Sequence, residues 1–124
     1  MILERLEGSF SVCRVSELRA EDVNRPFTFT AATDCEFSLV CDTSCAPQDA
    51  LKRDDGWTAY RVQGSLDFSL VGILASLADA LAAKKIPLFA VSTYETDYIL
   101  TQQPEAAEAA WREAGHEVKG RNEA

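Results

Sequence analysis

The sequence predicts an α+β protein made of two small units with antiparallel sheets. In the second half, hydrophobic patterns give the order strand, helix, strand, strand, helix, strand, which is the ferredoxin-like βαββαβ plan. The first half predicts the same plan with a degenerate first helix. Asp54, Asp55 and Gly56 interrupt these patterns, so we place the boundary there, with units at residues 1–55 and 56–124.

The elements of the first unit follow from short apolar patterns. Residues 10–15 have strand character, and residues 27–31 alternate strictly between apolar and polar side chains, the period of a half-buried strand. A turn joins this strand to another at 37–41, so residues 27–41 are predicted to form an antiparallel hairpin. Residues 46–53 are predicted as a short helix with a proline in its first turn.

The second unit begins with a strand at residues 57–62. Apolar residues then recur at helical spacing, which predicts a helix over 70–81 with Ser69 or Asp67 as its N-cap. The chain then continues with two hairpin strands at residues 87–93 and 98–101. A helix that starts at a proline follows at 104–115, and a short final strand at 116–118. Gly115 is expected to cap the C-terminus of the last helix.

The composition limits the partners and the compartment. The chain of 124 residues carries 20 acidic and 12 basic residues, a formal net charge of −8. Such a surface repels a phosphate backbone, so we expect no nucleic-acid partner. The chain starts without a basic and apolar leader, and no apolar run reaches the ~18–20 residues of a membrane span. We therefore expect a cytoplasmic protein with no membrane partner.

The four cysteines leave three alternatives, namely a zinc site, a disulfide and reduced thiols. They are Cys13, Cys35, Cys41 and Cys45, all in the first half and irregularly spaced. No second pair of ligands follows the last two, and the only histidine is His116. We expect reduced thiols, no metal and no cofactor.

Two features of the second unit are candidates for a small-ligand site. Gly72 lies at the start of the longest helix, where free N–H groups favour an anion such as a carboxylate. Residues 92–97, Ser-Thr-Tyr-Glu-Thr-Asp, place hydroxyls and carboxylates at a hairpin turn. Each feature alone also has a structural explanation, close helix packing for the glycine and a solvated turn for the polar segment.

Topology favours a shared site. In a ferredoxin-like unit the start of the first helix and the end of the second strand can be near neighbours, which would bring Gly72 and Ile73 close to residues 93–97. Backbone donors on one side and Asp97 or Glu95 on the other suit a zwitterion. The donors would hold a carboxylate, and the acidic side chain would take an ammonium or a guanidinium.

We expect no catalytic residues. The sequence offers no nucleotide-binding loop, no plausible metal cluster and no pair of nucleophile and base. His116 follows a helix-ending glycine and is predicted to be solvated. Asp67 is more simply explained as a helix cap than as the partner of Asp97 in an acid–base couple.

Longer motifs carry a family resemblance. Residues 64–74 match the pattern G-x-L-D-F-S-x-x-G-I-L, and residues 92–98 match S-T-Y-x-T-D-Y. With weaker likenesses at 36–41 and 55–57, this sequence resembles the ACT domains, small amino-acid-sensing modules. It is most similar to the bacterial two-ACT proteins related to the CASTOR arginine sensors. The resemblance covers most of residues 9–116.

The resemblance implies two tandem ACT units that pair through their sheets, usually in a dimer. It also implies a ligand between ACT units that touches Gly72, Ile73 and Asp97, and that is surrounded by the residues of the strand turn, Thr93, Tyr94, Glu95 and Thr96. We therefore expect a non-catalytic, amino-acid-binding regulatory protein that forms a homodimer. The alternatives are a structural or protein-interaction ACT module with a vestigial pocket, and an enzyme of unrecognised type.

Overall fold

The computed structural model describes residues 1–63 and 72–120, which form two compact units. One unit, here called the inserted unit, is Gly8–Trp57. The other, here called the main unit, contains Met1–Glu7 and the described residues from Thr58 onward. The first seven residues therefore lie in the same unit as the second half of the chain, whereas the boundary predicted at residues 54–56 placed them with the first half. The expected α+β class with mainly antiparallel ferredoxin-like sheets is confirmed.

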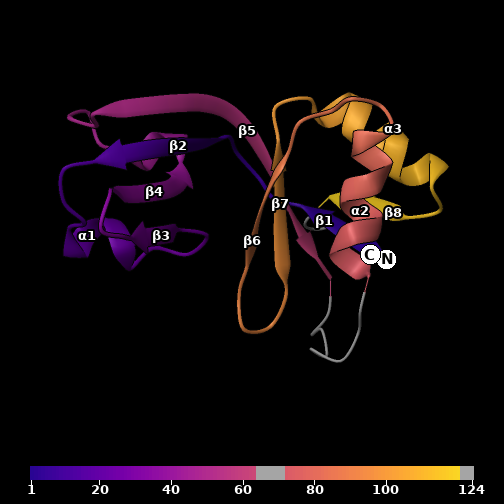
Figure 1. The fold of residues 1–124 in the computed structure, drawn as a ribbon, viewed down its shortest axis with the longest axis horizontal. Coiled ribbons are helices and arrows are strands. Elements are labelled where there is room, and N and C mark those ends of the chain that lie inside the picture. Colours follow the sequence, from indigo (N-terminus) through magenta and orange to yellow (C-terminus); the bar gives the residue numbers. More distant parts are fainter. Residues whose placement is uncertain (64–71, 121–124) are drawn as a thin grey trace. The chain divides into compact units, whose positions relative to one another are not determined.

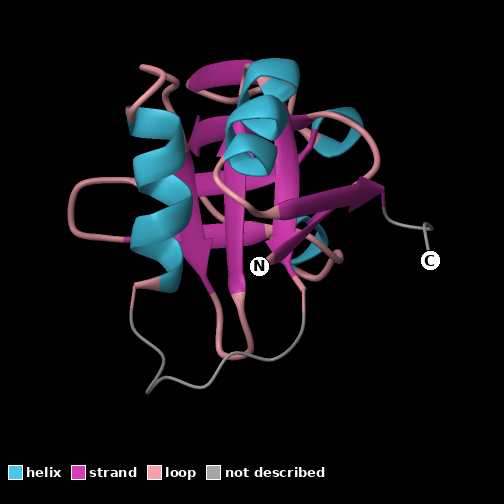
Figure 2. Ribbon diagram, turned by 90° about the vertical axis from the view of Figure 1, so that its right-hand side faces the viewer, coloured by secondary structure: helices cyan, strands magenta, loops and turns pink. Residues whose placement is uncertain are grey.

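The main unit has the predicted βαββαβ order. It contains the second half of β5 (Lys52–Val62), followed by α2 (Ile73–Ala82), β6 (Phe89–Ser92), β7 (Asp97–Thr101), α3 (Pro104–Glu113) and β8 (Glu117–Gly120). Its strands follow the order β6-β7-β5-β1-β8, and both helices cover one face of the sheet (Figures 1 and 2). The start of the helix predicted at 70–81 falls partly outside the described residues, which show it from Ile73.

Strand β1 (Ile2–Arg5) was not predicted. It lies between β5 and β8, antiparallel to the first and parallel to the second, with Leu3 opposite both Val62 and Val118. The pattern of four residues is too short to identify a strand, and both partners are distant in sequence. Pairing with β1 also extends β8 to Gly120, two residues beyond the predicted end.

The core of the main unit fixes the two helices on the sheet. It consists of buried residues from β1, β5, α2, β7, α3 and β8 and the segment after α2, namely Leu3, Tyr60, Val62, Leu77, Leu81, Ile86, Ile99, Ala107, Ala110, Trp111 and Val118. The Trp111 ring packs edge-on against Tyr60, with ring centroids 4.9 Å apart. Its indole Nε1 donates to the Leu77 carbonyl of α2 at 3.0 Å. This contact links α3 directly to the middle of α2.

The inserted unit is the degenerate version of the same plan. Its elements are β2 (Phe10–Val15), α1 (Ala20–Val23), β3 (Phe29–Ala32) and β4 (Phe37–Asp42), followed by the first half of β5. The strands follow the order β3-β4-β2-β5, and the predicted 27–41 hairpin is confirmed as the β3–β4 pair. Its one α-helix within this described segment has four residues, so the helical layer is reduced to a single turn.

The helix predicted at 46–53 was wrong. A 3₁₀ turn, η1 (Thr43–Cys45), follows β4 instead, and the Asp42 side chain caps it by accepting from the Ser44 amide at 2.9 Å. Residues 46–51 form a loop, because β5 already begins at Lys52 and leaves too few residues for a stable helix.

Asp54, Asp55 and Gly56, which the sequence pattern predicted as an interruption between two elements, all lie within the continuous strand β5. Between the pairs Phe10–Trp57 and Val12–Asp54 the register shifts, so that two residues of β5 face one of β2. This is a β-bulge, and Gly56, with φ +86°, supplies the left-handed conformation that such a bulge uses. Turn-forming residues therefore mark a bulge in a continuous strand here.

Candidate functional site

The structure places the two predicted parts of the ligand site at the same end of the main unit. The start of α2 and the turn between β6 and β7 both lie at the lower end in Figures 1 and 2. A side-chain contact also ties the turn to the end of β5, because the buried Thr96 hydroxyl donates to the Val62 carbonyl at 2.7 Å. The turn therefore lies beside the point where the chain leaves β5 on its way to α2.

Gly72 is the N-cap residue of α2 and is exposed. Its φ of +81° lies in the left-handed region, which strains any residue with a side chain. A Cβ built at this position meets no described atom within 4 Å, so the conformation of the backbone, and not close packing, requires the glycine. The predicted caps Ser69 and Asp67 lie outside the described residues.

Ile73 is the first residue of α2. Its side chain is half-buried and packs against the core of the main unit. The first N–H groups of any α-helix lack partners within the helix, and they carry the positive end of the helix dipole.

The β6–β7 turn is built by two threonines. The Thr93 amide and hydroxyl both donate to the Thr96 carbonyl, at 2.8 and 2.9 Å. The Thr96 hydroxyl donates to the Val62 carbonyl, so the two threonines shape the turn through their own hydrogen bonds. Tyr94, 80% exposed, and the exposed Glu95 lie at the tip of the turn.

Asp97 begins β7 and is half-buried. It lies directly opposite Ser92 of β6, and the Ser92 hydroxyl donates to Asp97 Oδ1 at 2.6 Å. This bond orients the carboxylate at the edge of the turn. The sequence-predicted carboxylate thus occupies a defined position next to the turn, at the same end of the unit as Gly72.

The inserted unit repeats this turn without its polar pair. Between β3 and β4, the Thr33 amide and hydroxyl donate to the Glu36 carbonyl at 3.0 and 3.2 Å, the same two bonds as in β6–β7. The flanking pair is Ala32 opposite Phe37, in the place of serine and aspartate. The turn geometry is therefore duplicated, whereas the carboxylate is specific to the main unit.

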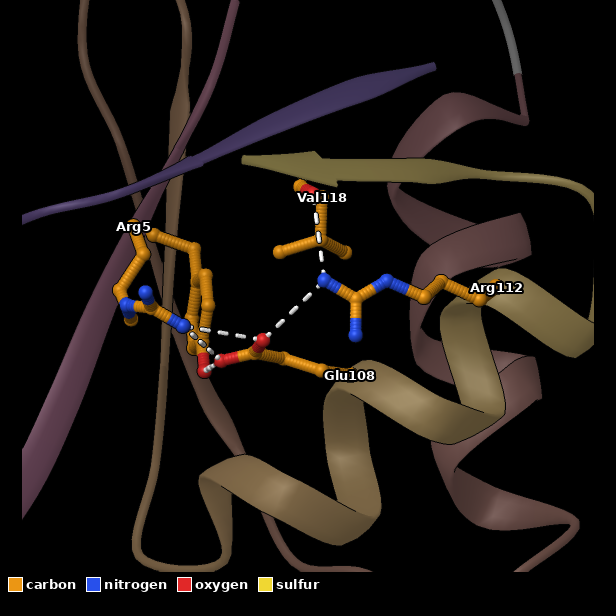
Figure 3. Close-up of polar contacts among 5 residues, drawn as sticks. Arg5, Glu108, Arg112 and Val118 are labelled. Carbon is orange, nitrogen blue, oxygen red and sulfur yellow. Dashed lines mark hydrogen bonds and ion pairs between the residues drawn. The ribbon is translucent and has the colours of Figure 1, made fainter. Parts of the chain in front are cut away.

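Sequence reasoning missed a buried polar cluster around Glu108 of α3. Its side chain is 9% exposed and accepts from Arg5 Nη1 of β1, at 2.9 and 3.0 Å (Figure 3). The Tyr60 hydroxyl of β5 donates to Glu108 Oε2 at 2.6 Å. Arg112 bridges from Glu108 Oε1, at 3.5 Å, to the Val118 carbonyl of β8, at 3.2 Å (Figure 3).

This cluster joins four elements of the main unit through one carboxylate. Burial, followed by the hydrogen bond to Glu108, raises the pKa of Tyr60 well above its ordinary value, so the phenol stays a donor. A signal was available in the sequence, because Glu108 falls on the apolar stripe of α3, three residues before Trp111. We assign the cluster to stability, because it binds its own groups and lies among the elements of the core.

Other candidate chemistry is limited in the described residues. Cys13 and Cys41 are buried in the core of the inserted unit, and burial raises the pKa of Cys41 to about 12. Within residues 1–63 and 72–120, no group of histidine, cysteine, aspartate or glutamate side chains is placed to hold a metal ion. No helix in the same ranges is long and apolar enough to cross a membrane.

Comparison with known proteins identifies relatives of both halves. Residues 52–110 match the ACT domain family. The whole chain is similar to protein Atu0741 from Agobacterium tumefaciens, with 31% identity and a TM-score of 0.88, over 98% of this chain and 94% of the other. No curated protein matches the sequence significantly.

Two more distant structures share the fold. The aspartokinase alpha and beta subunits match 93% of this chain and 97% of their own, with 13% identity and a TM-score of 0.63. Aspartate kinase of Clostridium acetobutylicum, described as an allosteric enzyme, matches 90% of this chain and 33% of its own, with 8% identity and a TM-score of 0.62. At these identities the likeness shows a common fold only.

Proposed function

This chain belongs to the ACT-domain proteins, in one family with Atu0741, and from that premise we propose that it is a non-catalytic regulatory module that binds a free amino acid. ACT domains are commonly regulatory modules for small molecules, and the allosteric aspartate kinases share this fold. Fold alone does not establish a function, so the proposal depends on a site. One observation carries it, namely that the start of α2 and the β6–β7 turn lie at the same end of the main unit (Figure 2).

The ligand would span these two features. Its carboxylate would accept from the backbone N–H groups near Gly72 and Ile73, where the helix dipole favours negative charge. Its cationic group would face Asp97, which Ser92 already orients at 2.6 Å. Tyr94 and Glu95 would flank the ligand from the tip of the turn, while Thr93 and Thr96 maintain the shape of the turn.

The finer assignments belong to the same proposal. We place the protein in the bacterial CASTOR-like subtype, with ACT-like units at residues 1–55 and 56–124, because the motifs at 64–74 and 92–98 resemble that group. We also propose a cytoplasmic homodimer without a nucleic-acid or membrane partner. Edge strand β3, which pairs only with β4 in the described sheet, is one surface that a second copy could cover. A strict monomer in sedimentation at tens of micromolar would refute the dimer.

Calorimetry with arginine and leucine tests the ligand site. Asp97→Asn keeps the shape of the side chain but removes its charge, so arginine binding should weaken by roughly 1.5–3 kcal/mol, the range for hydrogen bonds to charged groups. Leucine should be affected much less. Asp79→Asn, an exposed change on α2 with the same loss of charge, is the matched control and should leave both affinities unchanged.

The outcomes separate the proposal from its alternative. Equal losses for arginine and leucine in Asp97→Asn would mean that Asp97 organises the hairpin and does not recognise charge. If the wild-type protein gives no heat with any of the twenty amino acids, the amino-acid-binding function is wrong. The structural or interaction module would then be the better description.

A further inference from the structure

His116 connects three parts of the main unit through one side chain. Its backbone is fixed by the cap of α3, because its amide donates to the Trp111 carbonyl at 2.9 Å. The sequence pattern predicts a solvated ring, whereas the ring is half-buried in the structure. Its Nδ1 lies 3.2 Å from the Met1 nitrogen, just before β1, and its Nε2 lies 3.2 Å from the Ser76 hydroxyl of α2.

Backbone hydrogen bonds fix both partners of the ring. The Met1 carbonyl accepts from the Glu117 amide at 2.9 Å, which holds Met1 in the sheet beside β8. The Ser76 amide donates to the Gly72 carbonyl at 2.8 Å, and this bond closes the first turn of α2. The ring is therefore bonded to two fixed points, and one of them is the residue that closes the turn at the start of α2.

The donor at Met1 determines the protonation state of the ring. The Met1 nitrogen offers only donors, so Nδ1 of His116 accepts from it and carries no proton. In a neutral imidazole the other nitrogen then carries the proton, so Nε2 donates to the Ser76 hydroxyl. A proton added to Nδ1 would place two donors face to face. The bond between His116 and Met1 therefore exists only while the imidazole is neutral.

The surroundings of the ring also favour the neutral form. Burial, followed by the positive charge of the Met1 nitrogen, lowers the pKa of His116 below its ordinary value of 6.5. The carboxylates on the neighbouring elements, Asp79 of α2, Glu113 of α3 and Glu117 of β8, are all exposed, and none of them offsets this effect. The folded protein therefore holds the neutral ring at neutral pH.

We propose that His116 is a proton-sensitive link that ties the first turn of α2 to β1 while neutral, and that loses Met1 and frees this turn when protonated. The unfolded chain binds the proton more readily, so the contribution of the link is complete above pH 6.5 and is lost as the pH falls. His116 is a positioning residue, because it acts through Ser76 on the backbone at Gly72. The effect of the link on ligand binding, but not the link itself, rests on the proposed function.

Nuclear magnetic resonance of the full chain without ligand tests the link at pH 7 and pH 5. His116 is the only histidine, so no other side chain has its ordinary pKa between these values. The ring nitrogens should show the Nε2–H form at pH 7. The protection of the Ser76 amide against hydrogen exchange should fall at pH 5 by roughly three- to tenfold, the loss expected for one hydrogen bond.

The Ala83 amide, which donates to the Asp79 carbonyl at 3.0 Å near the other end of α2, is the internal control and should keep its protection. An Nδ1–H ring at pH 7, or equal protection of the Ser76 amide at both pH values, would overturn the proposal. Failure of every amino acid to bind would refute the proposed function and leave this measurement valid.

Variants separate the proton-sensitive link from a merely structural role. His116→Gln keeps a neutral donor and acceptor at this position, so the protection of the Ser76 amide should be the same at pH 7 and pH 5. Asp79→Asn, an exposed change one turn along α2, should keep the pH dependence of the wild type. If His116→Gln also keeps this pH dependence while retaining a folded spectrum, another group causes it and the proposal is wrong.

Discussion

At the level of single residues, burial divides the cysteines into reactive and protected thiols. Cys13 and Cys41 are each 1% exposed, whereas Cys35 is exposed in the β3–β4 turn. Burial raises the pKa of Cys41 to about 12 and also raises that of Cys13. The thiolate is the reactive species, so Cys13 and Cys41 are protected in two ways. Their raised pKa keeps the thiols protonated, and their burial keeps a reagent from reaching them.

We predict that timed labelling with a maleimide modifies Cys35 first and leaves Cys13 and Cys41 unmodified until the protein is unfolded. Mass spectrometry of the digested protein measures the order, and labelling in urea, where all four thiols react, is the control. Rapid modification of Cys41 in the native protein would contradict its burial.

The same shift predicts how stability depends on pH. The folded pKa of Cys41 exceeds the value of 9.0 expected for an unfolded chain. The stability that the neutral Cys41 thiol gives to the folded state is therefore fully present below pH 9. It is lost as the pH rises from 9 toward 12, where the free energy of unfolding falls by up to about 1.4 kcal/mol per pH unit. Urea titrations at pH 8 and pH 10 should show a smaller decline for Cys41→Ala than for the wild type.

At the level of elements, the two helices of the main unit end with the same motif on different residues. After α3, the His116 amide donates to the Trp111 carbonyl at 2.9 Å, and Gly115 takes φ +94°. After α2, the Ile86 amide donates to the Leu81 carbonyl at 3.0 Å, but Lys85 takes φ +58°. These are Schellman caps, which favour glycine at the left-handed position.

We therefore predict that Lys85→Gly stabilises the protein. Relief of the left-handed strain, about 1–2 kcal/mol, exceeds the added entropy of an unfolded glycine, about 0.5–1 kcal/mol. The free energy of unfolding in urea should rise by about 0.5–1 kcal/mol. Gly115→Ala is the reverse change at the equivalent position and should lower it. A loss of stability in Lys85→Gly would show that the side chain of Lys85 outweighs its backbone strain.

An element could be predicted when the residues that determine it lie close together in the sequence, and was missed when they lie far apart. The β6–β7 hairpin, α3 and the glycine cap at Gly115 follow from neighbouring residues and are confirmed. Strand β1 was missed because its partners lie far along the chain, and the bulge at Gly56 was mistaken for a break because glycine marks both.

The parts of the candidate site follow the same rule. The polar turn at 92–97 was predicted from local residue chemistry. The bond from Thr96 to Val62, and the cluster that joins Glu108 to Arg5, depend on contacts that only the fold creates.

At the level of the whole molecule, one strand serves both units. The first half of β5 pairs with β2 in the inserted unit, and its second half pairs with β1 and β7 in the main unit. The buried apolar side chains of the inserted unit that the structure describes are Phe10, Cys13, Val15, Leu39, Val40 and Cys41, and four of them, Cys13, Val15, Leu39 and Cys41, form one cluster. A unit of this size buries too little apolar surface to be stable without support.

We predict that the two units unfold in one cooperative transition. The chain provides a probe for each, because Trp57 lies in the inserted unit and Trp111 in the main unit. The Trp111→Phe variant keeps only Trp57, so its fluorescence reports unfolding of the inserted unit. The Trp57→Phe variant keeps only Trp111, so its fluorescence reports unfolding of the main unit. Circular dichroism measures the secondary structure of the whole chain in each variant. Within each variant the two signals should give the same urea midpoint, because loss of either sheet removes a partner of β5. A fluorescence transition of Trp57 that precedes the circular dichroism transition would show that the inserted unit unfolds independently, and that β5 does not transmit stability between the sheets.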